Sequence, residues 1–598
     1  MSEQPIAVSS LSRGEKMSRG VGSGTIKKGE LILEVRDLTV RFWVNNDWFV
    51  AAEEMNFDLC AGEVLAIVGE SGSGKTQSSM SLIGLLPANG RSTGSAKLKG
   101  TELIGMPLNK LREVRGNEIA VIFQEPMTAL NPVYTVGFQI VETLRTHFVM
   151  NPTDAKDRAL ELMRLVEIPN PEDSFNKFPH QLSGGQRQRI MIAQSLSCDP
   201  KLLIADEPTT ALDVTVQGEI LKLMRDLRER VDAAIILITH DMGVVADMAD
   251  RIIVMKDGKV VEHGTSEQIF GAPKHPYTQQ LLAAVPHLGS ASEPVEGVPR
   301  LSLVARDDKP IPLTSGDSAV TPALLLENAC IEYPKAGRRA AFRAAHQINL
   351  RVDPGEVIGL VGESGSGKTT IGRAAVALLP VVEGKISVAG RDITHARPKD
   401  LKPFRKDVGI VFQDPGSSLN PRLPVGESIG EPLLLHQGLK GAELSKRVEA
   451  LLDSVELPRA MRNRYPHELS GGQRQRIGIA RALALEPKLL IADEPTSALD
   501  VSVQARVLLL FQELQQRYGF ACLFISHDLA VVEMLSERIA VMRNGRLVEV
   551  GPTREIVSAP QHPYTQRLLS AVPVPDPAEQ KKRRELRDAI IAKEKIVS

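Results

Sequence analysis

The sequence of 598 residues lacks the features that would place a protein within a membrane, outside the cell or on nucleic acid. Its longest apolar runs, such as Ala233–Ile238, are much shorter than the about 18 residues of a membrane span. Lys and Arg total 72 against 73 for Asp and Glu, so no basic excess indicates nucleic-acid binding. Residues 1–30 are polar and lack the apolar core of a secretory signal. We therefore expect a cytoplasmic protein whose first 30 residues are disordered.

Cysteine is also scarce. The four cysteines are scattered, with no C-x-x-C pair and no metal-ligand spacing: Cys60, Cys198, Cys330 and Cys522. This pattern predicts buried thiols in a reducing compartment rather than disulfides or a zinc site. Apolar residues make up 42% of the chain, which is enough for ordinary globular cores.

One eight-residue stretch occurs twice and fits the P-loop pattern G-x-x-x-x-G-K-[ST]. An apolar run precedes each copy and a helix-compatible segment follows. The glycines allow backbone N–H groups to surround a phosphate at a helix start, the lysine reaches the β- and γ-phosphates, and the threonine hydroxyl binds Mg²⁺. The predicted phosphate-binding residues are Gly69, Ser71, Gly72, Gly74, Lys75 and Thr76, and again Gly362, Ser364, Gly365, Gly367, Lys368 and Thr369.

The segment before the first P-loop, from about Leu31 to Leu59, alternates apolar and polar residues as half-buried strands do. Phe42 lies where an adenine ring could stack, and Tyr333 holds the equivalent place in the second half. The alternative is that these aromatic rings only pack at the rim of the core.

A polar amide follows an apolar run in each half. Gln124 and Gln413 stand in Phe-Gln-[Glu/Asp]-Pro, which is typical of a strand that enters a loop. Each amide could point at a metal ion or at water, and the alternative is a solvated loop residue.

A Leu-Ser-Gly-Gly-Gln sequence then opens a helix predicted from Arg187 to Leu196 and, in the second half, from Arg474 to Leu483. Free N–H groups at a helix start suit an anion, so a second phosphate contact is available in each half. Its residues are Ser183, Gly185 and Gln186, and Ser470, Gly472 and Gln473.

Two acids end the next buried strand in each half, at the edge where open α/β sheets bind ligands. Asp206 and Asp493 can hold Mg²⁺, whereas Glu207 and Glu494 can orient and deprotonate the attacking water. The alternative is that these acids only cap the helix that follows.

A further strand ends in a histidine, His240 or His527, whose imidazole could bond a γ-phosphate oxygen. Ser183, Glu207 and His240 all recur 287 residues later in the chain. This constant offset shows two homologous halves without insertions across this region.

Both halves resemble the ATP-binding subunits of ABC transporters, because six motifs, the five above and an Ala-Leu-Asp sequence at residues 211–213 and 498–500, occur twice in the same order. The resemblance implies an α/β fold with two tandem P-loop NTPase (ABC ATPase) domains, each with a β-rich N-terminal part, a parallel-sheet core and a helical subdomain. It implies that Gln124 and Gln413 are Q-loops and that His240 and His527 are switch histidines. It also implies that the segments 183–186 and 470–473 are the signatures of the two halves. We expect a disordered segment (1–30), two ATP-binding domains (31–285 and 323–575), a Pro/Ser-rich linker (286–322) and a charged tail (576–598).

Each half ends in Pro-x-His-Pro-Tyr-Thr followed by a leucine pair, which resembles the oligopeptide/dipeptide/nickel importers. The two-in-one arrangement is most similar to the fused ATPases of glutathione or microcin-type peptide importers. Some relatives carry an iron–sulfur cluster on cysteines after His-Pro-Tyr, and we predict none here. We expect His275 and His562 to lie in Pro-flanked turns that open helices rather than to bind metal.

The resemblance implies an ATPase that uses ATP and Mg²⁺ to energise solute import, peripheral to the cytoplasmic face of a bacterial inner membrane. Implied partners are two transmembrane permease subunits and, through them, a periplasmic solute-binding protein, with no nucleic acid. It also implies that the signature of one half serves the ATP on the other half's P-loop. Short peptides, glutathione, nickel chelates or opine-like solutes all fit. The rival class, a soluble tandem ATPase acting on ribosomes or DNA, would be expected to show a charged helical linker or zinc-binding cysteines.

Overall fold

The computed structural model describes residues 28–597, except 210–211, 287, 289–319, 335–340, 398 and 498. The predicted disordered segment, apart from residues 28–30, and most of the predicted linker therefore lie outside the described residues. The chain forms two compact units, nearly all of the first before Gln280 and nearly all of the second from Gln280 on.

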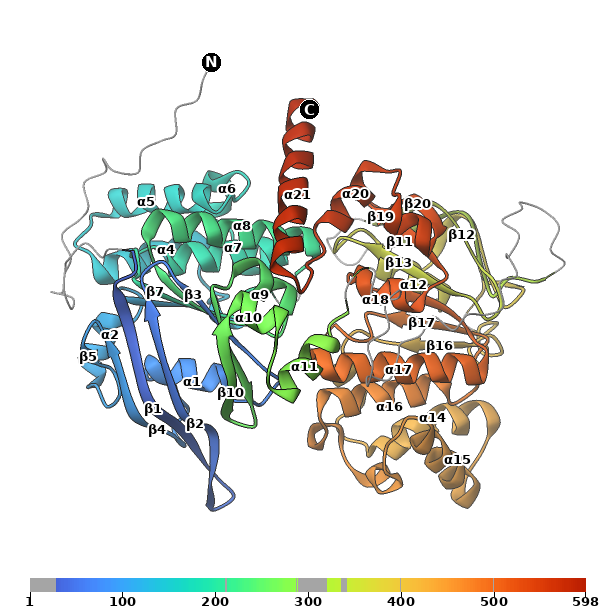
Figure 1. Cartoon of the computed structure of the whole chain (residues 1–598). Coiled ribbons are helices and arrows are strands. Elements are labelled where there is room, and N and C mark those ends of the chain that lie inside the picture. Colours follow the sequence, from blue (N-terminus) through green and yellow to red (C-terminus); the bar gives the residue numbers. More distant parts are fainter. Residues whose placement is uncertain are drawn as a thin grey trace. The chain divides into compact units, whose positions relative to one another are not determined.

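The first unit contains one antiparallel and one mostly parallel sheet (Figure 1). The antiparallel sheet has the order β2-β1-β4-β5, with strands β1 (Leu31–Val44), β2 (Asp47–Cys60), β4 (Gly90–Leu98) and β5 (Thr101–Glu102). The second sheet has the order β10-β9-β3-β8-β7-β6, in which only β10 is antiparallel to its neighbour. Its strands are β3 (Val64–Val68), β6 (Ile119–Ile122), β7 (Leu202–Asp206), β8 (Ala234–Ile238), β9 (Arg251–Lys256) and β10 (Lys259–Thr265).

The second unit repeats this architecture with the orders β12-β11-β14-β15 and β16-β17-β18-β13-β19-β20. The antiparallel sheet is built from β11 (Leu324–Tyr333), β12 (Phe342–Val352), β14 (Val381–Val388) and β15 (Arg391–Asp392). The other contains β13 (Val357–Gly362), β16 (Val408–Val411), β17 (Leu489–Asp493), β18 (Ala521–Ile525), β19 (Arg538–Arg543) and β20 (Arg546–Pro552).

The helices follow the strands in a similar order in both halves, although among the described residues α2, α6 and α21 have no α-helical counterpart in the other half. Those of the first half are α1 (Lys75–Leu82), α2 (Leu108–Val114), α3 (Pro126–Ala129), α4 (Val136–His147), α5 (Pro152–Leu165), α6 (Pro171–Phe175), α7 (Gly184–Ser195), α8 (Val214–Val231), α9 (Met242–Met248), α10 (Ser266–Gly271) and α11 (Pro276–Ala283). Those of the second half are α12 (Lys368–Ala375), α13 (Pro415–Ser418), α14 (Val425–Gln437), α15 (Gly441–Ser454), α16 (Gly471–Leu483), α17 (Val501–Tyr518), α18 (Leu529–Leu535), α19 (Thr553–Ser558), α20 (Pro563–Ser570) and α21 (Pro577–Val597).

The central strands are buried on both faces, which explains their unbroken apolar sequences. Side chains alternate between the faces of a strand, and in β7 Leu202 and Ile204 join the core beneath the antiparallel sheet. Leu203, between them, joins the core formed with helices α4, α5 and α7. The parallel sheet is therefore the middle layer, and its carboxyl edge carries the polar residues of the predicted site.

One face of α5 packs into the core: Ala159, Leu162 and Met163, with Val166 just after the helix, are buried in one cluster. The signature helices begin earlier than predicted, at Gly184 and Gly471 instead of Arg187 and Arg474. The reason is local: the serine before each glycine pair caps the helix.

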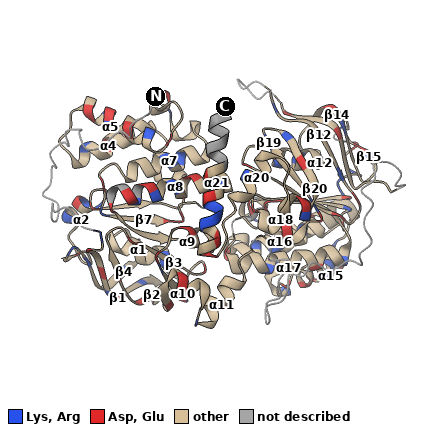
Figure 2. Ribbon diagram, turned by 45° about the horizontal axis from the view of Figure 1, so that its top comes forward, with Lys and Arg blue, Asp and Glu red and all other residues tan. Residues whose placement is uncertain are grey.

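The charged tail forms α21, whose basic residues Figure 2 shows as a blue band. In the described part of the chain, no helix has both the length and the hydropathy needed to cross a bilayer.

Candidate nucleotide-binding site

The backbone of each P-loop requires glycine at its last turn. Gly74 caps α1 with φ +92°, and a Cβ there would lie 2.0 Å from the carbonyl oxygen of Ala51. Gly367 caps α12 with φ +105°, and its Cβ would lie 2.7 Å from the carbonyl oxygen of Ala344. Both the left-handed conformation and the close approach of another strand exclude a side chain. Both loops therefore have the same form: a strand, a glycine-rich turn and the start of a helix. The free N–H groups at such a helix start can bind a phosphate.

The P-loop lysines are buried within their own loops. The Lys75 Nζ donates to the carbonyl oxygens of Gly69 and Glu70, each at 2.7 Å. Lys368 makes the same bonds to Gly362 at 2.7 Å and to Glu363 at 2.9 Å. Burial lowers the pKa of Lys368, although nearby carboxylates oppose that shift. Each ammonium group is thus held at the centre of the predicted phosphate cradle.

A hydroxyl and a carboxylate meet beside each loop. Thr76 Oγ1 donates to Asp206 Oδ1 at 3.1 Å, and Thr369 Oγ1 donates to Asp493 Oδ1 at 3.0 Å. Burial raises the pKa of Asp206 to about 6, and it also raises the pKa of Asp493. A buried carboxylate next to a hydroxyl, both presenting oxygen atoms, is a donor set that fits Mg²⁺.

Each predicted catalytic glutamate is held by the predicted Q-loop and switch residues of its own half. Glu207 accepts a hydrogen bond from Gln124 Nε2 at 2.7 Å, and its other oxygen lies 3.0 Å from His240 Nδ1. The three side chains come from the ends of the adjacent strands β6, β7 and β8. The sheet topology therefore unites residues that are more than 100 positions apart in the chain.

The second half repeats this cluster. Gln413 Nε2 donates to Glu494 at 2.8 Å, and His527 Nδ1 lies 3.3 Å from the same carboxylate. Burial opposes both charges, but the ion pair outweighs it, so the pKa of Glu494 is lowered and that of His527 is raised. The pairing favours an ionised carboxylate, which is the form that a general base needs.

Both glutamates also have an uncommon backbone conformation. The φ angle is +46° at Glu207 and +47° at Glu494, in the left-handed region that residues other than glycine rarely adopt. Each backbone N–H donates to the neighbouring strand, to Ile238 at 2.8 Å and to Ile525 at 2.9 Å. Such strain is typical of functional positions, where the surrounding structure over-determines it.

The signature residues form capping boxes at the starts of α7 and α16. Ser183 Oγ accepts from the Gln186 N–H at 3.3 Å, while Gln186 Oε1 accepts from the Ser183 N–H at 3.1 Å. Ser470 and Gln473 make the same reciprocal pair. Ser183 and Ser470 are both exposed. The capping boxes explain the serine and glutamine structurally, and the phosphate role of these residues stays a prediction.

The two candidate adenine-stacking residues lie on β1 and β11. Phe42 is half-buried against the core of the antiparallel sheet. The Tyr333 hydroxyl lies 3.3 Å from Thr370 Oγ1, one residue after Thr369 in α12. Phe42 thus packs on the antiparallel sheet, whereas Tyr333 lies beside the helix that follows the second P-loop. Adenine stacking by either ring stays a prediction.

The prediction of buried thiols is correct for Cys198, Cys330 and Cys522 but wrong for Cys60, which is half-buried. Cys60 is the last residue of β2, and its side chain is only partly covered at this end of the strand. His275 and His562 open helices as predicted: the ring Nδ1 of each accepts the N–H of the tyrosine two residues later. The prediction that the chain holds no iron–sulfur cluster remains a prediction.

Sequence reasoning missed one contact of the P-loops. The N–H of Glu70 donates to the hydroxyl of Tyr277, and that of Glu363 donates to Tyr564, both at 3.1 Å. The signal was available in the repeat of Pro-x-His-Pro-Tyr-Thr in both halves, but nothing in the sequence indicates what the tyrosine touches.

Residues 52–210 and 345–497 match the ABC transporter family. The chain belongs to this family. Residues 261–304 and 548–596 match the C-terminal region of oligopeptide/dipeptide transporters, once after each ATPase half. The chain is thus a tandem ABC ATPase coupled to transport, of the peptide-importer type.

Among similar proteins, the glutathione import ATP-binding protein GsiA of Pectobacterium atrosepticum is 47% identical over 92% of this ABC ATPase and 90% of the relative. GsiA of Escherichia coli K12 is 46% identical over 93% of this chain and 92% of the relative. A solved dimeric ATP-binding cassette in a post-hydrolysis state with ADP and Pi is 32% identical; it covers 39% of this chain and 99% of that chain, with a TM-score of 0.36.

Proposed function

We propose that this ABC ATPase hydrolyses ATP at two sites to drive the import of short peptides or peptide-like solutes, glutathione among them. The observation that carries the proposal is the similarity to two GsiA proteins over at least 92% of the chain. The oligopeptide/dipeptide C-terminal region after both halves supports an importer over a ribosome- or DNA-acting ATPase. It also leaves nickel chelates and opine-like solutes as the second candidate class.

The proposed sites assign one role to each cluster described above. The P-loop N–H groups and Lys75 or Lys368 bind the phosphates. Glu207 or Glu494 takes the proton of the attacking water, and the glutamine and histidine that contact it position its carboxylate. Thr76 with Asp206, and Thr369 with Asp493, would hold Mg²⁺, and the amide oxygens of Gln124 and Gln413 could serve as further ligands. The metal would neutralise charge on the phosphates.

We also propose, on the family resemblance alone, that Ser470, Gly472 and Gln473 contact the ATP on the first P-loop. Ser183, Gly185 and Gln186 would contact the ATP on the second. ATP binding would then favour a closed state of the two halves, and hydrolysis would reopen them. This closing and opening would move the permease subunits that bind this ATPase at the cytoplasmic face of the membrane. A nucleotide-loaded structure in which one half alone surrounds each ATP would contradict this arrangement.

Substituting Lys75 by Ala tests the first nucleotide site. Loss of a charge-assisted bond to phosphate is expected to weaken ATP binding at that site by about 10- to 100-fold. Lys368→Ala should do the same at the second site, measured by equilibrium binding of labelled ATP. Lys259→Ala is the matched control, because its ammonium group is exposed and pairs with Glu53 on the surface. Unchanged binding in both P-loop variants would refute the proposed sites.

The solute class is tested in a reconstituted complex of this ATPase, its permease subunits and the solute-binding protein encoded beside it. Hydrolysis should rise when the binding protein carries glutathione or a dipeptide, and should stay at the basal rate with a nickel chelate. Stimulation by the nickel chelate alone would instead assign the second candidate class.

A further inference from the structure

The tyrosine of each His-Pro-Tyr-Thr sequence reaches back about 200 residues to the P-loop of its own half. The Tyr277 hydroxyl accepts the N–H of Glu70, the second residue of the first P-loop, at 3.1 Å. Tyr564 accepts the N–H of Glu363 at the same distance. Tyr277 is 5% exposed and Tyr564 2% exposed, so each hydroxyl serves an interior contact. Two independent copies of one bond make a chance contact a poor explanation.

Glu70 is held from two sides. Its N–H is bound by the tyrosine, while its carbonyl oxygen accepts Lys75 Nζ at 2.7 Å. An ammonium group has three N–H donors. When Lys75 donates to a phosphate, it shares those donors between the ligand and the loop, so its hold on Glu70 weakens. The bond from Tyr277 does not depend on the lysine and keeps this end of the loop in place.

The tyrosine ring is itself firmly positioned. The Lys256 ammonium lies 4.8 Å from the centre of the Tyr277 ring, and the Arg543 guanidinium lies 4.9 Å from that of Tyr564. Both cations end the strand that lies beside the P-loop strand in the sheet, β9 or β19. Burial raises the pKa of Tyr564 to about 12, so its hydroxyl stays protonated at any working pH.

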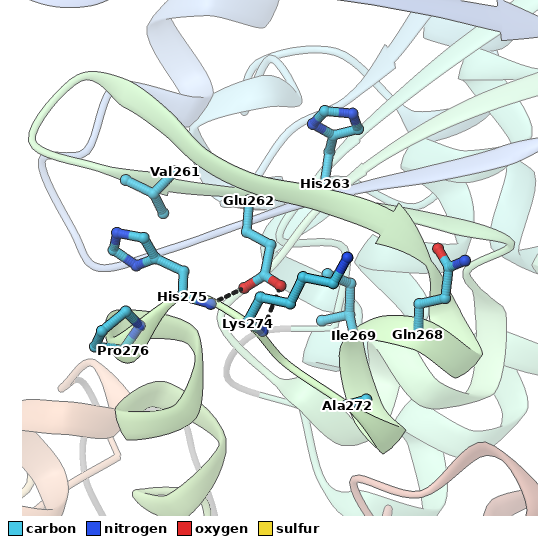
Figure 3. Close-up of a pocket in the computed structure, with 9 residues that line it drawn as sticks. All are labelled: Val261, Glu262, His263, Gln268, Ile269, Ala272, Lys274, His275 and Pro276. Atoms are coloured by element: carbon cyan, nitrogen blue, oxygen red, sulfur yellow. Dashed lines mark hydrogen bonds between the residues drawn. The ribbon is translucent and has the colours of Figure 1, made fainter.

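The turn before the tyrosine is anchored by a carboxylate. Glu262 accepts the backbone N–H groups of Lys274 at 2.7 Å and His275 at 3.0 Å, and Figure 3 shows both bonds at a surface pocket of about 540 Å³. Glu549 makes the equivalent bonds in the second half, to Gln561 and His562. The histidine then caps the helix that carries the tyrosine. A continuous set of bonds therefore joins β10 or β20, the His-Pro-Tyr turn and the P-loop.

We propose that Tyr277 and Tyr564 are positioning residues that pre-organise the P-loop for ATP and link nucleotide binding to the His-Pro-Tyr turn. The inference rests on the proposed nucleotide sites. A loop already held in its binding conformation loses less conformational freedom when ATP binds, which raises affinity. Because coupling between two sites is reciprocal, bound ATP must stabilise the tyrosine contact by the same factor.

The test compares Tyr277→Phe with the wild-type full chain. Phenylalanine keeps the ring and removes only the acceptor, which leaves the Glu70 N–H without its partner. We expect ATP to bind about tenfold more weakly at the first site, from the cost of one unsatisfied, partly buried donor. The turnover number should change less than about twofold, because Glu207 and Gln124 lie on other loops and Asp206 ends strand β7. Tyr564→Phe should have the same effect at the second site, and Tyr518→Phe on α17, a half-buried ring away from the P-loops, is the control.

Hydrogen exchange supplies a readout that a purely structural role would not move. In the wild-type chain, Mg-ATP should slow amide exchange in residues 273–279 and 560–566 by up to about tenfold. Tyr277→Phe should abolish this protection in 273–279 only. A lower melting temperature with unchanged ATP affinity and unchanged protection would overturn the inference. If Lys75→Ala also binds ATP normally, the proposed nucleotide site itself is wrong. If Lys75→Ala loses ATP binding but Tyr277→Phe does not, the nucleotide site holds and only the role of the tyrosine is wrong.

Discussion

The double variant Glu207→Gln, Glu494→Gln is expected to hydrolyse ATP at least about 100-fold more slowly than the wild type while it still binds ATP. General-base catalysis by a positioned side chain contributes about 10²- to 10⁴-fold, and an amide cannot accept the proton of water. Glutamine has nearly the same shape, so the P-loop contacts to phosphate remain. Steady-state phosphate release measures the rate, and labelled-ATP binding measures the retained affinity.

The single variants ask whether the two sites are equivalent. Glu207 and Glu494 have matching contacts to a glutamine and a histidine, so each single substitution should lower hydrolysis to a similar extent. Glu513→Gln, an exposed residue on α17, serves as the control and should leave the rate unchanged. If one single variant keeps full activity and the other has none, the sites are not equivalent.

The variant Asp206→Asn is expected to stabilise the protein while it removes a proposed magnesium ligand. Burial raises the pKa of Asp206 to about 6 from 3.8, so ionisation of this carboxylate opposes folding. A shift of about two pKa units corresponds to about 3 kcal/mol at neutral pH. Differential scanning calorimetry in the absence of nucleotide should show a rise of about 5–10 °C in melting temperature for the unit that contains Asp206. With Asp493→Asn added, hydrolysis should fall at least about 100-fold.

The stabilisation by Asp206→Asn should depend on pH. A carboxyl whose folded pKa lies above its unfolded pKa binds its proton more tightly in the folded state, so wild-type stability falls as pH rises from about 4 to about 6. The stabilisation by Asp206→Asn should therefore be nearly absent at pH 4 and complete above about pH 6.5. Asp257→Asn, in the exposed turn between β9 and β10, is the control. Equal stabilisation at pH 4 and pH 7 would show that the carboxylate charge is not the cause.

The P-loop pattern predicted the strand, loop and helix order, and α1 begins at Lys75 within the motif, because a glycine at a left-handed turn and this order of elements are local properties. Local patterns did not predict the exposure of Cys60, since burial at a strand end depends on the elements that cover it. The start of α7 was misplaced for a different reason: the capping box that begins it uses side-chain bonds that residue periodicity does not report.

The order of the motifs and their repetition, read from the chain alone, determined that the protein is a duplicated nucleotide-binding α/β fold, and they led to the proposal of which residue types face the phosphates. Those features are local, because a glycine-rich turn, a buried strand and a terminal acid each act within a few residues. Only the tertiary structure decided that Gln124 and His240 both contact the carboxylate of Glu207. It alone also decided that the Tyr277 hydroxyl accepts the backbone N–H of Glu70. These contacts span 33 to 207 residues and depend on strand order and helix packing, which sequence spacing does not encode.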